Sequence, residues 1–289
     1  MNKKQYLIIG ASGYISSNLI KHFDYKKIPY KALSLSISNN NVYRSDKLSI
    51  DQLDKVFQNS HTIIYCAGYS KNDSCNQKKN SEINYLKRII NFTIKNKIKK
   101  FIYLSSSKLN HNYYNNLYTS NKSLIEDIIH KSFFNYHINY VILRLSPVFG
   151  LGHKSTIYKL NKLISFLPLA IVPDLYTKKS FIYISDLVQT LLLISKKNLQ
   201  KNLYNLSYTE PITIKELFFK LNQNFSKKIT FIIPSLLINI ILNFLSIIIG
   251  RKYVFFFLND EINNSNDLFT ELNWFPTYSF NRALKKGNI

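Results

Sequence analysis

The sequence predicts an α/β protein: a doubly wound parallel sheet followed by a smaller C-terminal cap of helices and strands. Short apolar runs alternate with longer amphipathic stretches through the first half of the chain. Strands separated by helical patterns indicate crossover connections, and therefore a parallel sheet with helices on both faces. The apolar runs show little alternation of polar and apolar residues, as expected for strands that are buried on both faces.

The order of these segments defines the expected elements. Strands are expected at residues 6–9, 30–36, 61–66, 99–105 and 138–145, with helices between them at 14–23, 50–58, 80–96 and 117–134. The pattern loosens after Gly150, where the expected segments are a helix at 155–167, a strand leading into a helix at 181–194, a strand at 203–207, and helices at 213–224, 235–249 and 265–273. Residues 1–168 are assigned to the core, with 181–207 returning to it, and residues 169–289 mainly to the cap.

The chain is strongly basic, with 39 Lys and Arg residues against 16 Asp and Glu and a formal net charge of +23. Such a field attracts nucleic acids, anionic lipids or phosphorylated small molecules. The lysines are scattered among many Asn, Ile, Tyr and Phe residues, as A/T-rich codons would produce. The sequence has no helix-turn-helix, zinc-knuckle or RNP-like pattern, so no nucleic-acid partner is expected.

The cysteines and the N-terminus point to a reducing compartment. Two cysteines, Cys66 and Cys75, suggest neither a disulfide framework nor a metal site. Cys66 lies in an apolar strand and is expected to be a small core residue. Four consecutive strongly apolar residues precede Gly10, too few for a signal peptide. A cytoplasmic protein is expected.

Residues 235–250 form the most apolar stretch of the cap. Ser235, Asn239, Asn243 and Ser246 recur in it at helical spacing, so a narrow polar stripe interrupts the apolar run. A bilayer span is not expected, because it needs about 18 or more uninterrupted apolar residues. A helix packed in the cap or at a subunit contact is expected, and a helix lying in a membrane interface is the alternative.

The stretch QYLIIGASGYISSNL, residues 5–19, contains two of the seven glycines of the chain. An apolar strand that ends at Gly10 and is followed by Gly13 and a helix is typical of a turn that holds a pyrophosphate at a helix N-terminus. Gly10 would make the tight turn, and Gly13 would let the backbone approach the phosphates. Ser16 stands where a third glycine would allow close packing of the helix on the strand.

The adenosine side of such a site is less clear. Asp46 ends a short strand-like segment at 41–46, and its carboxylate could accept a hydrogen bond from an adenine amino group. The alternative is that Asp46 caps the next helix. The segment LSLSISNNN, residues 33–41, has no acidic residue for an NAD ribose and no immediate arginine for a 2′-phosphate, so the choice between NAD and NADP stays open.

Tyr118 and Lys122 lie four residues apart at the start of an expected helix, so both point to the same face. The tyrosine pKa, near 10, is too high for proton transfer at neutral pH, and an adjacent ammonium would favour the phenolate. Serines end the preceding strand, at the carboxyl edge where open α/β sheets bind ligands. Their hydroxyls could bind a carbonyl or alcohol oxygen of a substrate.

These motifs resemble those of extended short-chain dehydrogenase/reductases of the NAD-dependent epimerase/dehydratase family, which act on nucleotide sugars. The resemblance runs nearly from end to end and implies a Rossmann-type core and a substrate-binding cap. It is carried by the segments IIGASGYISSNL, SDKLSIDQL, IIYCAG, SEINYLKRIINFTIKNKIKKFIYLSSS, YTSNK, LRLSPVFGLG, SFIYISDLV and ELNWFPTYSFNRAL, with Asn273 in place of a family glycine.

The resemblance also implies roles for single residues. It makes Tyr118 the acid/base, Lys122 its partner and ribose ligand, and Ser106 the hydroxyl at the substrate. Substrate contacts are implied for Ser106, Ser107 and for Lys179, which stands where the family usually has an arginine near the diphosphate. Contacts with NAD or NADP are implied for Gly10, Ser12, Gly13, Tyr14, Ile15, Asp46, Ala67, Gly68, Tyr118 and Lys122, and no metal is expected.

The residues after the strand narrow the reaction that the resemblance implies. Ser107 and Lys108 occupy the positions of the Asp-Glu pair of sugar-nucleotide 4,6-dehydratases, so no acid is present to eliminate water. SSSKLN is most similar to the Ser-Ser-x-Lys-x-Asn of bacterial enzymes that reduce a 4-keto UDP-sugar for surface polysaccharides. A UDP-sugar 4-epimerase is the alternative, and a cofactor-binding protein without turnover is a third interpretation. A homodimer is also expected, as helix pairs in such folds often form dimers.

Overall fold

The computed structural model describes residues 5–39, 41–68, 76–111, 116–153, 155–208, 210–249 and 251–286. The chain forms two compact units, each made of two stretches of sequence. Unit 1 comprises Met1–Leu145 and Leu187–Asn205, and unit 2 comprises Ser146–Asp186 and Leu206–Ile289. The second cysteine of the chain, Cys75, lies outside the described residues.

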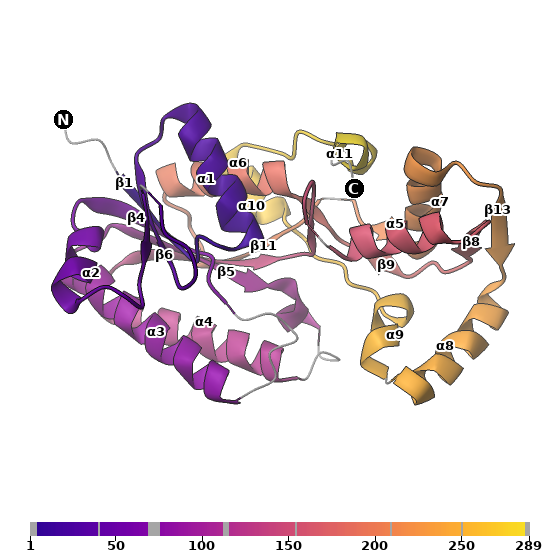
Figure 1. Cartoon of the computed structure of the whole chain (residues 1–289), viewed down its shortest axis with the longest axis horizontal. Coiled ribbons are helices and arrows are strands. Elements are labelled where there is room, and N and C mark those ends of the chain that lie inside the picture. Colours follow the sequence, from indigo (N-terminus) through magenta and orange to yellow (C-terminus); the bar gives the residue numbers. More distant parts are fainter. Residues whose placement is uncertain are drawn as a thin grey trace. The chain divides into compact units, whose positions relative to one another are not determined.

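Unit 1 is built on a seven-stranded sheet in the order β11-β6-β5-β4-β1-β2-β3 (Figure 1). The strands from β6 to β3 pair in parallel with their neighbours. The strand order runs outward in opposite directions from β1 and β4, so the topological switch point lies between these two strands. The strands are β1 (Gln5–Ile9), β2 (Tyr30–Ser34), β3 (Val42–Arg44), β4 (Ser60–Tyr65), β5 (Lys100–Ser106), β6 (Asn139–Leu145) and β11 (Leu203–Leu206). The expected doubly wound parallel sheet is confirmed.

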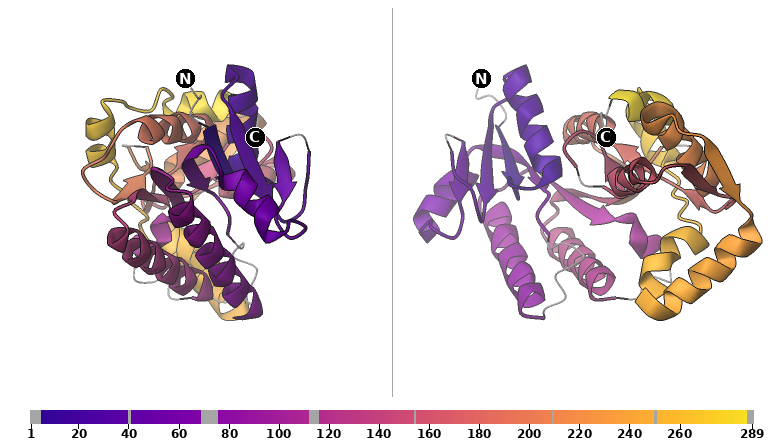
Figure 2. Two further views of the ribbon diagram at one scale, coloured as in Figure 1. Left: turned by 90° about the vertical axis from the view of Figure 1, so that its left-hand side faces the viewer. Right: turned by 45° about the vertical axis from the view of Figure 1, so that its right-hand side comes forward.

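Helices cover both faces of this sheet, as Figure 1 and the two views of Figure 2 show. Helices α3 and α4 lie side by side on one face, and α1 lies on the other. The helices of this unit are α1 (Tyr14–Lys26), α2 (Ile50–Phe57), α3 (Asn76–Lys95) and α4 (Leu117–Asn135), together with the larger part of α6 (Ile184–Lys196). A short 3₁₀ turn, η1 (Ser107–Asn110), follows β5 directly.

The core between the sheet and helices α3 and α4 is rich in aromatic side chains. Phe101 of β5 is fully buried, with its ring centroid 4.8 Å from that of Phe133 on α4 and 5.9 Å from that of Tyr65 on β4. Phe57 of α2 stacks on Phe92 of α3 at 5.1 Å. Such aromatic pairs add to the free energy of burial, so they fix the two helices against the strands.

Residues 187–205 return to unit 1 through specific polar contacts. The side chain of Lys100, at the start of β5, is buried, and its Nζ donates hydrogen bonds to the carbonyls of Ile194 (2.6 Å) and Lys197. A cation at this place satisfies carbonyls at the C-terminus of α6, which have no partner within the helix. Tyr6 Oη of β1 and Ser195 Oγ lie 2.9 Å apart on the same side.

Unit 2 contains short strands in three two-stranded sheets, β10-β7, β12-β9 and β13-β8. The strands are β7 (Val148–Phe149), β8 (Ala170–Pro173), β9 (Lys178–Lys179), β10 (Ile182–Tyr183), β12 (Ile212–Thr213) and β13 (Thr230–Ile233). The helices are α5 (Thr156–Phe166), α7 (Ile214–Leu221), α8 (Ser235–Ile249), α9 (Arg251–Leu258), α10 (Asn266–Leu272) and α11 (Phe280–Lys286). The elements of this unit that were not expected from the sequence are strands β7, β8, β9, β12 and β13 and helices α9 and α11.

Two details of unit 2 explain departures from the expected sequence pattern. The helix expected at 213–224 ends at Leu221 and continues as a π-helical turn, η2 (Asn222–Ser226), in which the Asn222 side chain bonds the backbone of Lys228. Asn273 ends α10 in the left-handed conformation, with a φ of 51°. Asparagine tolerates this region better than most residues, which explains how it replaces a glycine there.

Candidate active site

The turn after β1 needs glycine at position 10 for two reasons. Gly10 has a φ of +91°, which L side chains rarely adopt, and a Cβ added to it would lie 2.7 Å from the backbone nitrogen of Ala67. Its N–H and that of Ala11 donate to the Leu33 carbonyl, at 2.8 and 2.9 Å. The loops after β1, β2 and β4 therefore converge on this residue at the carboxyl edge of the sheet.

Ser16, which stands in place of a third glycine, is accommodated because its hydroxyl is buried and hydrogen-bonded. The side chain is fully buried, and its Oγ donates to the Gly10 carbonyl at 2.5 Å. It also forms a hydrogen bond with the Cys66 thiol, whose pKa is raised to about 12 by burial. Ser16 thus joins α1 to the turn rather than separating them. Gly13 is the N-cap of α1, and no side chain of the described residues caps this end.

A cavity of about 330 Å³ opens above this turn. It includes five of the expected cofactor residues and adds residues from the ends of β2 and β4 and from α3. The lining residues are Gly10, Ser12, Gly13, Leu33, Ser34, Leu35, Tyr65, Cys66, Ala67, Gly68, Ser81, Glu82 and Tyr85. Tyr14 and Ile15 form the first turn of α1 and are not among them. An uncapped helix N-terminus beside a glycine turn fits the pyrophosphate of a dinucleotide.

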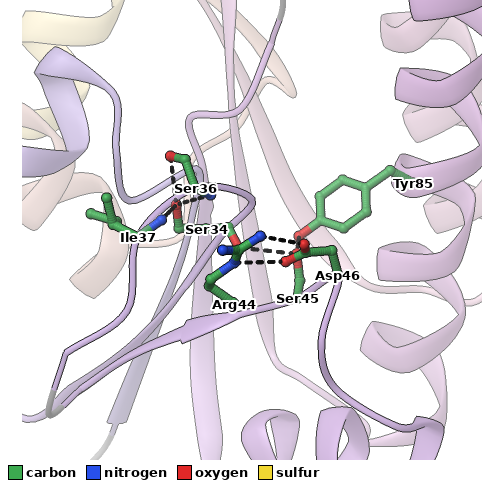
Figure 3. A network of polar contacts seen from close by, with 7 residues as sticks. All are labelled: Ser34, Ser36, Ile37, Arg44, Ser45, Asp46 and Tyr85. Carbon is green, nitrogen blue, oxygen red and sulfur yellow. Dashed lines mark hydrogen bonds and ion pairs between the residues drawn. The ribbon is translucent and has the colours of Figure 1, made fainter.

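The end of β2 carries a polar network that the sequence did not reveal (Figure 3). Ser34 Oγ accepts hydrogen bonds from the N–H groups of Ser36 and Ile37, at 3.1 and 3.2 Å. Arg44 lies opposite Ser34 in the parallel register of β2 and β3, so strand pairing places an arginine beside the end of β2. Residues 33–41 contain no arginine, and the neighbouring strand β3 provides this one.

Asp46 belongs to the same network. Its carboxylate accepts hydrogen bonds from Arg44 Nε at 3.2 Å and from Arg44 Nη2 at 2.6 Å, and this contact lowers the pKa of Asp46. The alternative role of Asp46 as a helix cap is wrong, because Ser49 caps α2 in a capping box with Gln52. Its contact with an adenine amino group stays a prediction.

Ser106 and Tyr118 lie together at the carboxyl edge of the sheet. Ser106 is the last residue of β5, and Tyr118 lies in the first turn of α4, which Asn116 caps. Burial raises the pKa of Tyr118; a hydrogen bond from the Ser106 side chain opposes this, and the negative charge of Glu82 adds to it. The shift is upward, opposite to the direction that the Tyr-x-x-x-Lys spacing predicts. Ser107 begins η1 and is buried.

The Lys122 ammonium contacts a different tyrosine. Its Nζ donates to Tyr103 Oη at 2.9 Å and to the Leu104 carbonyl at 3.3 Å, and lies 4.8 Å from the centroid of the Tyr103 ring. Burial lowers the pKa of Lys122, and Glu82 and Glu126 oppose this. A Cβ on Gly68 would lie 3.0 Å from Lys122 Nζ, so the ammonium approaches the cavity at Gly68.

Glu82 is a charged residue of this site that sequence reasoning missed. It is buried, lines the cavity, and accepts a hydrogen bond at Oε2 from Asn121 Nδ2 at 2.7 Å. Its charge raises the pKa values of Tyr118 and Lys122. A signal was present: Glu82 stands four residues before buried Leu86, so a carboxylate lies on the apolar face of α3.

Lys179 lies in unit 2 and has partners of its own. The side chain is 1% exposed, and its Nζ donates to Glu261 Oε1 at 3.0 Å and to the Asn259 carbonyl at 2.6 Å. Burial lowers the pKa of Lys179, and Glu261 opposes this. The residue ties β9 to residues 259–261, and its contact with a substrate diphosphate stays a prediction. Among the described residues, no group of His, Cys, Asp and Glu could hold a metal ion.

Comparison with known proteins identifies the family. The family model described as NAD dependent epimerase/dehydratase family matches residues 6–207. The chain belongs to this family. The resemblance seen in the sequence is thus confirmed, as is the expectation of an enzyme that binds NAD or NADP. No curated protein matches the chain.

Solved structures show the fold of this epimerase/dehydratase family member over nearly its whole length. The UDP-N-acetylglucosamine 4-epimerase of Bacillus cereus is 13% identical with a TM-score of 0.78, covering 98% of this chain and 97% of its own. The UDP-glucose 4-epimerase of Thermotoga maritima is 17% identical with a TM-score of 0.74 and the same coverages. The dTDP-glucose 4,6-dehydratase of Bacillus anthracis is 15% identical with a TM-score of 0.72, covering 98% and 95%.

Gly10→Ala is expected to destabilise the family's cofactor turn and to abolish dinucleotide binding. The substitution combines the strain of a positive φ, about 1–2 kcal/mol, with an overlap against Ala67. Gly152→Ala is the matched control, since Gly152 has a φ of +77° and nothing within 4 Å of the added Cβ. Thermal unfolding and cofactor titration measure both effects. Equal losses in the two variants would contradict the close approach to Ala67.

Lys179→Ala is expected to destabilise unit 2 by about 3–5 kcal/mol, because it leaves the Glu261 carboxylate buried without its cation. Denaturant unfolding followed by the fluorescence of Trp274 measures this loss. Lys215→Ala is the control: it removes a partly exposed ion pair with Asp174 and should change stability far less. If both variants unfold at the same denaturant concentration, Lys179 does not stabilise the unit in the way described.

Proposed function

We propose that this enzyme reduces the C4 ketone of a nucleoside-diphosphate sugar with NADH or NADPH. The single observation that supports it best is the state of Tyr118: a half-buried phenol whose pKa is raised, chiefly by loss of solvent, and whose hydroxyl is hydrogen-bonded to the Ser106 side chain. Such a phenol keeps its proton at neutral pH. A group at the carboxyl edge of the sheet that holds a proton is suited to donate it to an oxygen that gains negative charge.

The charges around Tyr118 support reduction over oxidation. An oxidation step needs a phenolate that accepts the proton of a sugar hydroxyl, and a nearby ammonium would stabilise it. Lys122 instead donates to Tyr103 and Leu104, and Glu82 places a negative charge near the phenol. Both features favour the protonated phenol. The site therefore starts in the state that a ketone reductase needs.

The roles of the residues follow from their places. A bound nicotinamide would supply the hydride for C4. Tyr118 donates its proton to the C4 oxygen, and Ser106 donates a hydrogen bond to the same oxygen, which positions the carbonyl. Lys122 and Gly68 meet at the edge of the cavity, where the ribose next to the nicotinamide would lie. Glu82 holds Asn121 and sets the local charge.

The substrate class rests on relatives rather than on the site alone. Two solved structures of similar fold are described as 4-epimerases of UDP-sugars, and a third as a dehydratase of dTDP-glucose. They support a nucleoside-diphosphate sugar as the substrate. The segment SSSKLN supports a 4-keto UDP-sugar of surface polysaccharide synthesis in the cytoplasm. Assembly into a homodimer stays a prediction, as does contact of α8 with a membrane surface.

A UDP-sugar 4-epimerase is the second candidate, favoured by the names of those neighbours. An epimerase retains its cofactor and consumes none, whereas a reductase oxidises added NADH or NADPH. Absorbance at 340 nm in the presence of a 4-keto UDP-sugar separates the two reactions. A protein that binds cofactor but changes neither sugar nor absorbance would be the cofactor-binding protein without turnover.

Tyr118→Phe is expected to lower the rate of NAD(P)H oxidation by about 10²–10⁴-fold, because it removes the proton donor. Cofactor affinity should stay close to that of the parent enzyme, since the ring and the cavity are kept. Stopped-flow absorbance and cofactor titration give the two quantities. Full activity in this variant would refute the proposed proton donor.

Glu82→Gln is expected to move the basic limb of the pH–rate profile to lower pH. The reductase is active while Tyr118 is protonated and loses activity as pH rises through the pKa of Tyr118. Glu82 raises that pKa, so neutralising Glu82 lowers it and the loss begins earlier. Asp46→Asn is the control, because Asp46 is paired with Arg44 at the end of β3. An unmoved limb in Glu82→Gln would show that Glu82 does not act on the proton donor.

A further inference from the structure

Helix α8 exposes apolar side chains to a degree unusual for a helix of a folded domain. Leu242 is buried, and it is the one buried side chain of residues 235–247. Six large apolar side chains of the helix are exposed: Leu236, Leu237, Ile240, Ile241, Phe244 and Ile247. A surface helix normally shows polar residues to solvent, so this pattern is reversed.

The exposed apolar residues form one continuous face. Leu236, Ile240, Phe244 and Ile247 follow each other at helical spacing, and Leu237 and Ile241 lie beside them on the same side. We call these six residues the α8 apolar face. The residues of the polar stripe, from Ser235 to Ser246, lie along one flank of this face. The polar stripe therefore leaves the α8 apolar face uninterrupted.

Helix α9 packs along α8, as Figures 1 and 2 show. The strand that leads into α8 also exposes apolar side chains. Ile229, Phe231 and Ile232, in and just before β13, are also exposed. Contiguous apolar patches of this kind mark an interaction surface.

The charge of the surrounding sequence indicates what covers this face. Residues 217–259 contain five Lys and Arg residues and no Asp or Glu. Lys227 and Lys228 precede the uncharged stretch 229–250, and Arg251 and Lys252 follow it. An apolar helix with basic residues at both ends matches the hydrocarbon boundary and the anionic headgroups of a bilayer. A second copy on this face would bring its own Lys and Arg residues against these, with no Asp or Glu of residues 217–259 to pair with them.

The length of α8 excludes a spanning orientation. Its 15 residues extend over roughly 22 Å, less than the hydrocarbon thickness of about 30 Å. Within the part of the chain that the structure describes, no helix is long and apolar enough to cross a bilayer. We infer that the α8 apolar face docks on an anionic membrane surface and lies in its plane. This inference goes beyond the proposed reaction and does not depend on it.

Flotation of the full-length protein with lipid vesicles tests the inference. Vesicles of two parts phosphatidylcholine to one part phosphatidylglycerol should carry the protein, and vesicles of phosphatidylcholine alone should carry much less. Phe244→Asp should weaken binding to the anionic vesicles by at least about tenfold, because it puts a charge where a phenyl ring would enter the acyl boundary. Phe244 is 64% exposed, so the variant should keep its fold, which circular dichroism checks.

Phe134→Asp is the matched control, since Phe134 is 68% exposed at the end of α4 in unit 1 and the change in charge is the same. It should leave vesicle binding within about twofold. Equal losses of binding in the two variants would show that vesicle binding comes from the overall positive charge of the protein, and would overturn the inference. So would failure to bind anionic vesicles. A dimer in solution that Phe244→Asp converts to a monomer, without vesicle binding, would assign the face to a second copy instead.

Discussion

The close approach of two loops at the centre of the sheet is the constraint on which the candidate site depends. The turn after β1 and the loop after β4 meet where Gly10 faces Ala67, with too little space between them for a Cβ. This contact brings Gly68 over Lys122 and lets Ser16 reach both the Gly10 carbonyl and the Cys66 thiol. The cavity exists because these backbones meet at the switch point, between the central strands β1 and β4, and not beside an outer strand of the sheet.

The electrostatics of the site are set by burial more than by the paired tyrosine and lysine. In solution an ammonium four residues away would favour a phenolate. Here Lys122 has two oxygen partners of its own. Besides burial, the pKa of Tyr118 is lowered by the Ser106 hydrogen bond and raised by the Glu82 carboxylate. The tyrosine of the same motif can therefore be a protonated phenol or a phenolate, depending on the residues that surround it. In this chain Glu82 adds to the effect of burial and favours the protonated phenol.

The sequence predicted the sheet of unit 1 well because its strands are buried on both faces and its helices are long. The expected strand at 99–105 and helix at 117–134 agree with β5 and α4 within one residue at each end. Strands β8 and β13 are four residues long, too short to show a period. Arg44 and the Tyr103 contact of Lys122 could not be predicted, because strand register and side-chain packing determine them. Glu82 was visible as an acid on an apolar face, a signal that was overlooked.

The buried ammonium of Lys100 at the end of α6 has a consequence for dissecting the protein. Residues 187–205 supply β11 and most of α6 to unit 1, and Lys100 holds them there through carbonyls of Ile194 and Lys197. A chain shortened at Leu145 would lack an outer strand and would leave that amine without the two carbonyls that accept its hydrogen bonds. A shortened chain that keeps unit 1 whole needs both stretches, Met1–Leu145 and Leu187–Asn205.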